Sequence, residues 1–209
     1  SNQLETDKDE KVRVALVRKI ALFNNSEAGN VLLNLLDDGS IAVKEAAASG
    51  ISRRGAGEFA KQLIEKVLDT DSWVGFFAAK SLAGVSDVSV VRKLEEYYGK
   101  VEQNVKLAVI EALGKCEDTD TEFLINNLND DNEDIRKEIL NALQTLNDSE
   151  ALKAALRLYN RDESWLVRYQ AVSIILSLKP EGYEALLRER IKREDNKYII
   201  ENIIGEIGE

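Results

Sequence analysis

Residues 69–84 read DTDSWVGFFAAKSLAG and contain one copy of the pattern that decides the fold. Val74 is followed by apolar residues four, five and eight positions later, at Ala78, Ala79 and Leu82. An α-helix turns by about 100° per residue, so these offsets place all four side chains on one face. We therefore expect the segment to form a helix with one buried apolar stripe.

The same stripe recurs along the chain at intervals of 31, 31, 31, 30, 32 and 32 residues. Its apolar anchors are Val12, Val43, Val74, Val105, Ile135, Val167 and Ile199. Second helical patterns lie between the copies, roughly at residues 24–37, 57–69, 86–99, 120–129, 149–160 and 181–194. A helix pair of this size cannot bury its apolar face alone, whereas stacked pairs can. The pattern predicts an all-α, right-handed α-solenoid of about six to seven repeats of about 31 residues, in a single domain over residues 1–209.

Three copies show the full repeat pattern: DDGSIAVKEAAASGI at 37–51, KVEQNVKLAVIEALG at 100–114 and DESWLVRYQAVSIIL at 162–176. This pattern resembles the short HEAT-like repeats of the phycobilin-lyase type, and the resemblance covers the chain from about Asp7 to Gly208. It implies an armadillo-like superhelix in which the second helix of each repeat lines the inner, concave surface. The family includes scaffolds, and lyase subunits that act on a tetrapyrrole and its acceptor protein.

Both ends of the sequence fall inside the repeat pattern. The first recognisable helix, at about 9–22, has no partner helix before it, and the last one stops near residue 208. We expect a fragment of a longer protein, with residues 1–6 as a tag remnant and flexible lead-in. Solenoids usually end in capping repeats, so self-association through uncapped ends is also expected.

Aromatic residues lie on the face of the second helices opposite the buried stripe. This face predicts binding residues at Trp73, Phe76, Leu107, Trp165, Tyr169 and Tyr198. Exposed apolar patches generally mark contacts, and Trp and Tyr are frequent binding anchors. The alternative is that neighbouring helices or loops cover these rings. For Phe77 that alternative is the better interpretation, and we expect its ring in the core.

A basic residue follows most anchors, and an acidic residue precedes most of them by five positions. We expect these residues to form a structural ladder of ion pairs that also caps the helices, made of Arg13, Lys44, Lys106, Arg136 and Arg168 with Asp7, Asp38, Asp130 and Asp162 or their neighbours. The alternative is that the basic residues form an anion-binding row. Gly75 replaces the basic residue in one repeat, and Lys100 replaces the acidic one in the next. The ladder should therefore be weakest at Lys100.

The composition argues against several classes of function. The net charge is −10, which disfavours binding to nucleic acid or to anionic lipid. The chain contains no histidine, so histidine-based catalysis and histidine metal sites are excluded. Cys116 has acidic neighbours that would not lower the pKa of its thiol. We expect no enzyme activity, no cofactor, no metal and no direct membrane insertion.

The sequence therefore predicts a non-catalytic scaffold that binds a protein segment, with Trp73, Phe76, Trp165 and Tyr169 as anchors. Acidic residues including Glu111, Glu133, Asp134 and Glu138 favour a basic or amphipathic partner. The first alternative is a lyase subunit or chaperone-like subunit of the phycobilin-lyase type. The second is a nucleic-acid-binding HEAT-like protein, which the acidic charge disfavours. We expect a cytoplasmic protein, although the chain could also belong to a membrane-anchored parent.

Overall fold

The computed structural model describes residues 9–147 and 149–208. Within these ranges the regular structure is entirely helical, with α-helices and two short 3₁₀ helices. The contacts divide the chain into two compact units, residues 1–119 and 120–209. The expected lead-in at residues 1–6, and Asp7, lie outside the described residues.

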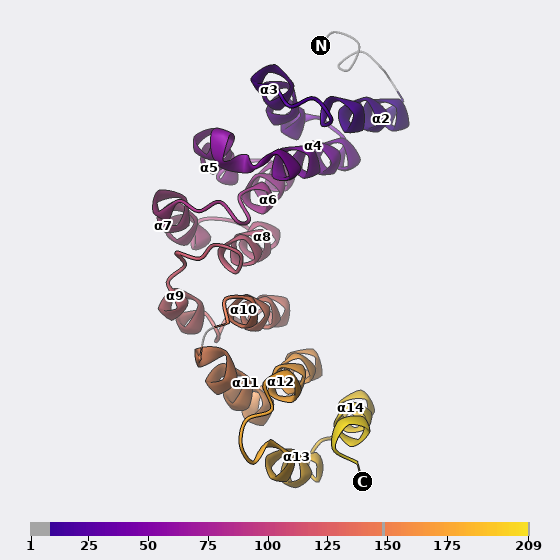
Figure 1. The fold of residues 1–209 in the computed structure, drawn as a ribbon, viewed down its shortest axis with the longest axis vertical. Coiled ribbons are helices and arrows are strands. Elements are labelled where there is room, and N and C mark those ends of the chain that lie inside the picture. Colours follow the sequence, from indigo (N-terminus) through magenta and orange to yellow (C-terminus); the bar gives the residue numbers. More distant parts are fainter. Residues whose placement is uncertain (1–8, 148, 209) are drawn as a thin grey trace. The chain divides into compact units, whose positions relative to one another are not determined.

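Unit 1 consists of antiparallel helix pairs stacked in two layers (Figure 1). One layer contains α2 (Glu10–Ile20), α4 (Ile41–Arg54), α6 (Ser72–Ser81) and α8 (Gln103–Leu113). The other layer contains α3 (Ser26–Asn34), η1 (Leu35–Asp37), η2 (Ala56–Phe59), α5 (Ala60–Val67) and α7 (Val88–Tyr98). The helices of the first layer begin at residues 10, 41, 72 and 103, so 31 residues separate successive starts.

Unit 2 repeats the same plan. One layer contains α10 (Glu133–Thr145), α12 (Trp165–Leu178) and α14 (Lys197–Ile207), which begin 32 residues apart. The other contains α9 (Thr121–Asn126), α11 (Glu150–Arg161) and α13 (Tyr183–Ile191). Each unit is thus a short stack of helix-turn-helix repeats, which confirms the predicted all-α repeat solenoid. The right-handed sense and the single-domain organisation stay predictions.

A pair of polar side chains fixes the start of four of the second helices, α4, α6, α10 and α14. In α6 the Asp69 carboxylate accepts the backbone N–H of Asp71 at 2.9 Å, and the Asp71 carboxylate accepts that of Trp73 at 2.9 Å. The same turn occurs before α10, where Asp130 accepts from Asn132 and Asn132 from Asp134. The acidic residue of the repeat pattern therefore closes the turn, and a residue two positions later caps the helix. Direct capping by the acidic residue, as expected above, is wrong for these helices.

The predicted apolar stripe forms the core of both units. Anchors Val43, Val74, Val105, Ile135, Val167 and Ile199 are each no more than 2 % exposed. The stripe is open only at the first and last described helices, where Val12 is 41 % and Ile204 38 % exposed. Among the described residues, α2 packs only on the repeat that follows it and α14 only on the repeat that precedes it. Part of the apolar stripe of each helix therefore stays in contact with water. No helix among the described residues is both long and apolar enough to span a membrane.

Candidate functional site

The candidate site is a groove of about 660 Å³ on the second helices of unit 1, which we call the aromatic groove. Three helices contribute to it, α4, α6 and α8, because the 31-residue repeat places the same face of each helix side by side. The residues that line the groove are Ile41, Glu45, Ala48, Ser49, Ser52, Trp73, Phe76, Phe77, Lys80, Ala83, Glu111 and Lys115. It brings together two of the predicted binding residues, Trp73 and Phe76.

A cluster of three rings on α6 forms the apolar part of the groove. The ring centroids of Trp73 and Phe76 lie 5.6 Å apart edge to face, and those of Phe76 and Phe77 5.1 Å apart in the same arrangement. Phe77 is 5 % exposed and lies in the core, as expected, whereas Trp73 is 40 % exposed. The Phe77 ring stacks on the Trp73 ring, with 6.1 Å between the centroids, while part of the Trp73 ring faces solvent. Such a supported, half-exposed indole provides apolar contact area that loses little rotamer entropy on binding.

The charges in the groove balance. Glu111 on α8 lies 3.4 Å from the Lys80 ammonium and 2.7 Å from the Lys115 ammonium. Burial raises the pKa of Glu111, but the hydrogen bond from Lys115 and the two lysine charges outweigh it and hold the pKa below its ordinary value. Glu45 has no ion-pair partner among the described residues, so two glutamates face two lysines. The groove is therefore neutral in sum, and Glu111 does not by itself favour a basic partner there.

Lys80 also shapes the aromatic surface. Its ammonium lies 5.6 Å from the centroid of the Phe76 ring, while it pairs with Glu111 on the neighbouring helix. A cation over a ring face is attracted by the ring quadrupole. Lys80 thus links the ring cluster of α6 to the charged edge contributed by α8.

The other predicted binding residues lie outside this groove. Leu107 on α8 is half-buried and is absent from the groove lining. Trp165, Tyr169 and Tyr198 belong to unit 2, where they are 41 %, 37 % and 53 % exposed. Trp165 on α12 stacks on Tyr198 of α14, with 6.0 Å between the ring centroids. The aromatic residues therefore form two separate clusters, one in each unit.

Ser49, Lys80 and Lys115 also line the groove and were not predicted from the sequence. Ser49, Lys80 and Glu111 each lie six positions after the anchor of their repeat, on the same face as Trp73. That regular offset could have identified them. Lys115 follows the end of α8, where helical periodicity gives no guide.

The predicted ladder connects several pairs of successive repeats. Arg13 of α2 contacts Asp38 at 3.1 Å, and Lys44 of α4 contacts Asp71 at 2.9 Å. Lys44 is 3 % exposed and also donates to the Leu36 carbonyl at 3.2 Å. Each basic residue therefore reaches forward to an acidic turn one repeat later, and holds that turn against its own helix.

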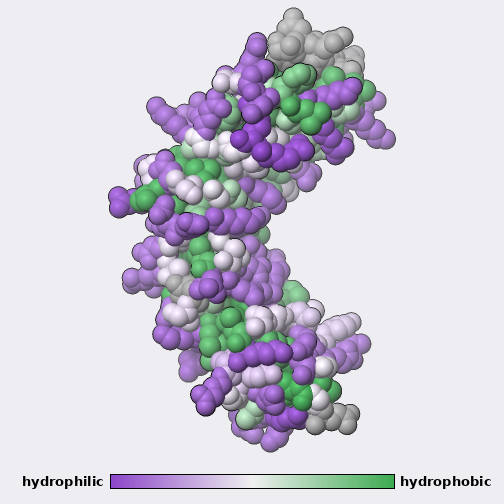
Figure 2. Space-filling view, viewed as in Figure 1, coloured by the Kyte–Doolittle hydropathy of each residue, from purple (hydrophilic) through white to green (hydrophobic). Residues whose placement is uncertain are grey.

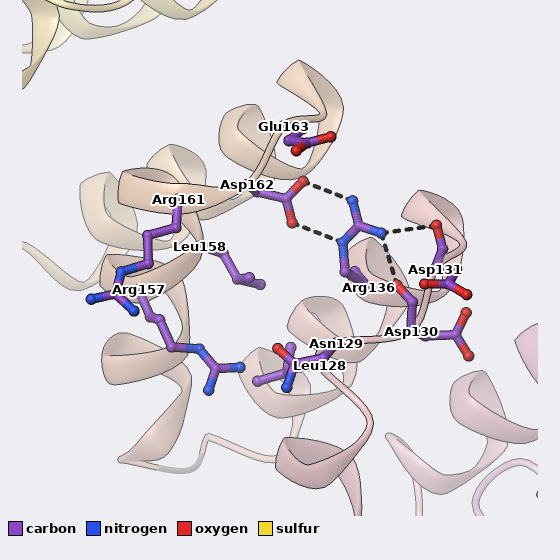
Figure 3. A pocket seen from close by; sticks show the side chains of 10 residues that line it. All are labelled: Leu128, Asn129, Asp130, Asp131, Arg136, Arg157, Leu158, Arg161, Asp162 and Glu163. Carbon is purple, nitrogen blue, oxygen red and sulfur yellow. Dashed lines mark hydrogen bonds and ion pairs between the residues drawn. The ribbon is translucent and has the colours of Figure 1, made fainter.

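Unit 2 has two further ion pairs of this type. Arg136 binds both carboxylate oxygens of Asp162 at 2.8 Å and donates to the backbone carbonyls of Asp130 and Asp131 (Figure 3). Arg168 binds both carboxylate oxygens of Glu194 in the same way, at 3.1 and 2.7 Å. These two-pronged contacts match the planar guanidinium to the carboxylate.

The ladder is interrupted where both partners are replaced. Gly75 stands at the basic position of α6, and Lys100 stands at the acidic position one repeat later. Lys100 instead pairs with Glu96 of the preceding helix α7, at 2.9 Å. Lys106 in unit 1 lies over the Tyr98 ring, 5.0 Å from its centroid. Position 75 therefore lacks the basic partner and position 100 lacks the acidic partner, so no ladder ion pair forms between these two positions.

Close packing explains the glycine. A Cβ atom at Gly75 would lie 2.8 Å from the carbonyl oxygen of Val67 and 3.2 Å from a methyl group of Val105. A side chain at this position would therefore push α6 away from the end of α5 and from α8. Gly75 therefore allows α6, the helix that carries the three rings of the groove, to pack closely on its neighbours.

Nothing in the described residues is arranged as a metal site, since no group of three histidine, cysteine, aspartate or glutamate side chains is placed to hold an ion. The Cys116 thiol is 1 % exposed, and burial raises its pKa. A thiol in this state is a poor nucleophile.

Comparison with known proteins supports the repeat assignment. A family model described as HEAT repeats matches residues 1–74 and 121–206, which is more than half of the chain. The chain belongs to the HEAT repeat family. A search of curated proteins gives no match.

Two solved structures share the fold of this HEAT repeat protein. The Escherichia coli protein YibA has a TM-score of 0.61 at 18% identity, with 100% of this chain and 82% of that chain covered. A chain from the complex of CpcE and CpcF of phycocyanin lyase from Nostoc sp. PCC7120 has a TM-score of 0.58 at 15% identity, with 97% and 90% covered. At these identities the likeness shows the fold alone.

Proposed function

We propose that this chain is a non-catalytic interaction module that binds a segment of a partner protein in the aromatic groove. The observation that carries the proposal is the half-exposed Trp73 ring, supported by Phe76 and Phe77 at the centre of a groove that three repeats build. A rigid, preformed groove lowers the ordering cost of binding. The chain of similar fold from the complex of CpcE and CpcF belongs to an assembly of two proteins, which is consistent with this role.

The chemistry of the groove suggests an amphipathic segment. An apolar side chain of the partner would contact Trp73, while polar groups of both signs would meet Glu45, Lys80, Glu111 and Lys115. Since the groove carries two charges of each sign, a strongly basic segment has no advantage there. We further propose that the protein is cytoplasmic, which a single free cysteine suits.

Selection of peptides from a displayed library tests the proposal directly. Peptides of about 12 residues would be selected on the purified chain, and the affinity of the best one measured for Trp73→Ala and for Leu68→Ala. Leu68 is 43 % exposed and lies outside the groove lining, so its variant is the matched control. We expect Trp73→Ala to weaken binding about thirtyfold or more, as removal of a binding anchor does, and Leu68→Ala to leave it unchanged.

Fluorescence locates the bound peptide. The chain contains two tryptophans, so a Trp165→Phe variant leaves Trp73 as the single reporter. A peptide in the groove should shift the Trp73 emission to shorter wavelength. Equal affinity of Trp73→Ala and wild type, with unchanged circular dichroism, would remove the groove from consideration.

A second candidate is a subunit of a two-chain lyase. The fold similarity to a chain of the phycocyanin lyase complex favours it, and the exposed rings of the groove could contact a flat pigment. Titration of a free bilin into the chain tests this candidate by visible absorption. A spectral shift that Trp73→Ala removes would support it, and an unchanged spectrum would contradict it.

A further inference from the structure

The aromatic cluster of unit 2 lies outside the aromatic groove and has no part in the proposed function. We call it the unit 2 aromatic face, and it consists of Trp165 and Tyr169 on α12 and Tyr198 on α14. Trp165 and Tyr169 are one helical turn apart, so their side chains share one face of α12. Trp165 stacks on Tyr198 across the two helices, and all three rings are exposed. Adjacent exposed rings on two packed helices generally mark a contact with another molecule.

The helices on both sides of α12 place mainly negative charge beside these rings. Within unit 2, α12 packs against α10 on one side and α14 on the other (Figure 1). The first, second, fifth and sixth residues of the three helices are equivalent, because the helices begin 32 residues apart. In α12 these residues are uncharged, whereas in α10 and α14 they include four acidic residues, Glu133, Asp134, Glu138 and Glu201, and two basic ones, Lys137 and Lys197. Figure 2 likewise shows hydrophilic side chains of unit 2 beside patches of hydrophobic ones.

Some of this negative charge is not compensated within unit 2. Lys137 pairs with Asp134 on its own helix at 2.7 Å. Glu133 on α10 and Glu201 on α14 are exposed, and neither forms a hydrogen bond or an ion pair with another described residue. One such carboxylate therefore lies on each of the two helices that flank α12.

The basic residues next to the rings are already engaged. The ammonium of Lys197 lies 5.0 Å from the centroid of the Tyr198 ring. Arg168 of α12 is held by Glu194 and Asp195, at 2.7 and 3.0 Å. The contact between Lys197 and Tyr198 shows that a ring of this face accepts a cation, and the rings of α12 remain exposed for a cation from another molecule.

We propose that the unit 2 aromatic face binds a basic segment of a partner protein, with an arginine of that segment stacked on the rings of Trp165 and Tyr169. A guanidinium is attracted by the face of an aromatic ring, and its N–H groups can pair with a carboxylate at the same time. Glu133 and Glu201 provide such carboxylates on the neighbouring helices. A purely apolar segment would cover these carboxylates without pairing them, which costs free energy. The proposal concerns unit 2 and does not depend on the aromatic groove.

The test uses a fluorescein-labelled peptide that alternates arginine and serine over about eight residues, and the same peptide with glutamine in place of arginine. Fluorescence anisotropy would measure the affinity of both peptides for wild type, for Trp165→Ala and for Glu133→Gln/Glu201→Gln. The charge variant changes two exposed side chains, so it tests the face even if Trp165→Ala lowers stability. Circular dichroism would check the fold of each variant.

Unit 1 supplies a matched control for each variant. Trp73→Ala removes the exposed tryptophan of the aromatic groove. Glu27→Gln/Glu65→Gln removes the same charge from exposed residues of α3 and α5, which belong to the other helix layer. Both controls leave the unit 2 aromatic face unchanged.

We expect the arginine peptide to bind, and Glu133→Gln/Glu201→Gln to bind it about tenfold more weakly, since hydrogen bonds to charged groups are lost. Trp165→Ala should weaken binding about fivefold, through loss of the contact between cation and ring. Both unit 1 controls should bind like wild type.

The proposal is overturned if the arginine peptide does not bind, if the glutamine peptide binds as tightly, or if Trp165→Ala binds like wild type. Equal losses in the two glutamine double variants would also overturn it, since they would show a dependence on net charge alone. A loss of affinity in Trp73→Ala alone would place the basic peptide in the aromatic groove and reject the unit 2 aromatic face.

Discussion

At Gly75 and Cys116 in unit 1, the neighbouring atoms determine which side chain fits. Gly75 lies in a helix interior, where a glycine costs about 1 kcal/mol relative to alanine. The carbonyl oxygen of Val67 stands where a Cβ atom would need space, so the glycine allows the closest approach of α6 to its neighbours. Cys116 follows the end of α8, and its nearly inaccessible thiol lies 3.9 Å from the Leu82 carbonyl oxygen.

Gly75→Ala should destabilise the protein by about 1–2 kcal/mol, because the cost of overpacking against backbone exceeds the gain in helix propensity. Gly205→Ala is the matched control, since a Cβ atom at Gly205 in α14 would meet nothing within 4 Å. That control should stabilise the protein by about 0.5–1 kcal/mol. Urea unfolding would measure both changes, and a stabilising effect of Gly75→Ala would show that the packing there is looser than described.

Cys116 should react with iodoacetamide far more slowly than a free thiol at pH 8. Burial both excludes the reagent and raises the thiol pKa, so little thiolate is present. Mass spectrometry over time, with and without urea, would measure the rate. Rapid labelling without urea would mean that unit 1 opens around Cys116 under native conditions.

At the scale of elements, the ladder fastens helices of successive repeats. Arg136 of α10 forms an ion pair with Asp162, which precedes α12. The Arg136 side chain is 14 % exposed and the Asp162 side chain is 3 % exposed. The hydrogen bonds that Arg136 donates to Asp162 raise the pKa of Arg136 further above its ordinary value, so the guanidinium stays charged at any pH near neutrality. Because both groups are desolvated, removal of one partner leaves the other buried without compensation.

Arg136→Ala should therefore destabilise the protein by about 2–4 kcal/mol. Lys137→Ala, which removes an exposed pair with Asp134 on the same helix, should cost less than about 0.5 kcal/mol. The double variant Arg136→Ala/Asp162→Ala should cost less than the sum of its single variants, because the pair acts as one unit. Additive effects in urea unfolding would contradict that coupling.

At the scale of the whole molecule, the chain carries 38 acidic and 28 basic side chains, and the fold holds the pKa of some of the acidic ones below the ordinary value. The hydrogen bond from Lys44 contributes most to holding the pKa of Asp71 below its ordinary value. Burial opposes the same effect at Glu194, but hydrogen bonds from Arg168 and from the backbone of Asn196 outweigh it and lower that pKa too. Folding therefore favours the ionised form of these turn carboxylates.

The lowered pKa values of these carboxyl groups set the direction in which the stability of the fold changes with pH. A carboxyl group whose pKa is lower in the folded state contributes stability that is complete above about pH 4.5 and is lost as the pH falls toward the folded-state value. The urea midpoint should be nearly constant from pH 7 to pH 5 and then fall. Glu194→Gln should be less stable than wild type at pH 7, and the difference should shrink at pH 3. A constant difference across this range would contradict the assignment to Glu194.

The sequence by itself determined the repeat length, the all-α class, the buried stripe and the core position of Phe77. Each of these follows from helical periodicity, which is local and is written directly in the order of apolar residues. Only the tertiary structure decided which acidic turn each basic residue reaches, why Gly75 is a glycine, and that Lys80 and Lys115 neutralise Glu111. These features depend on the offset between stacked helices, which the packing of several side chains sets jointly and no single helix encodes.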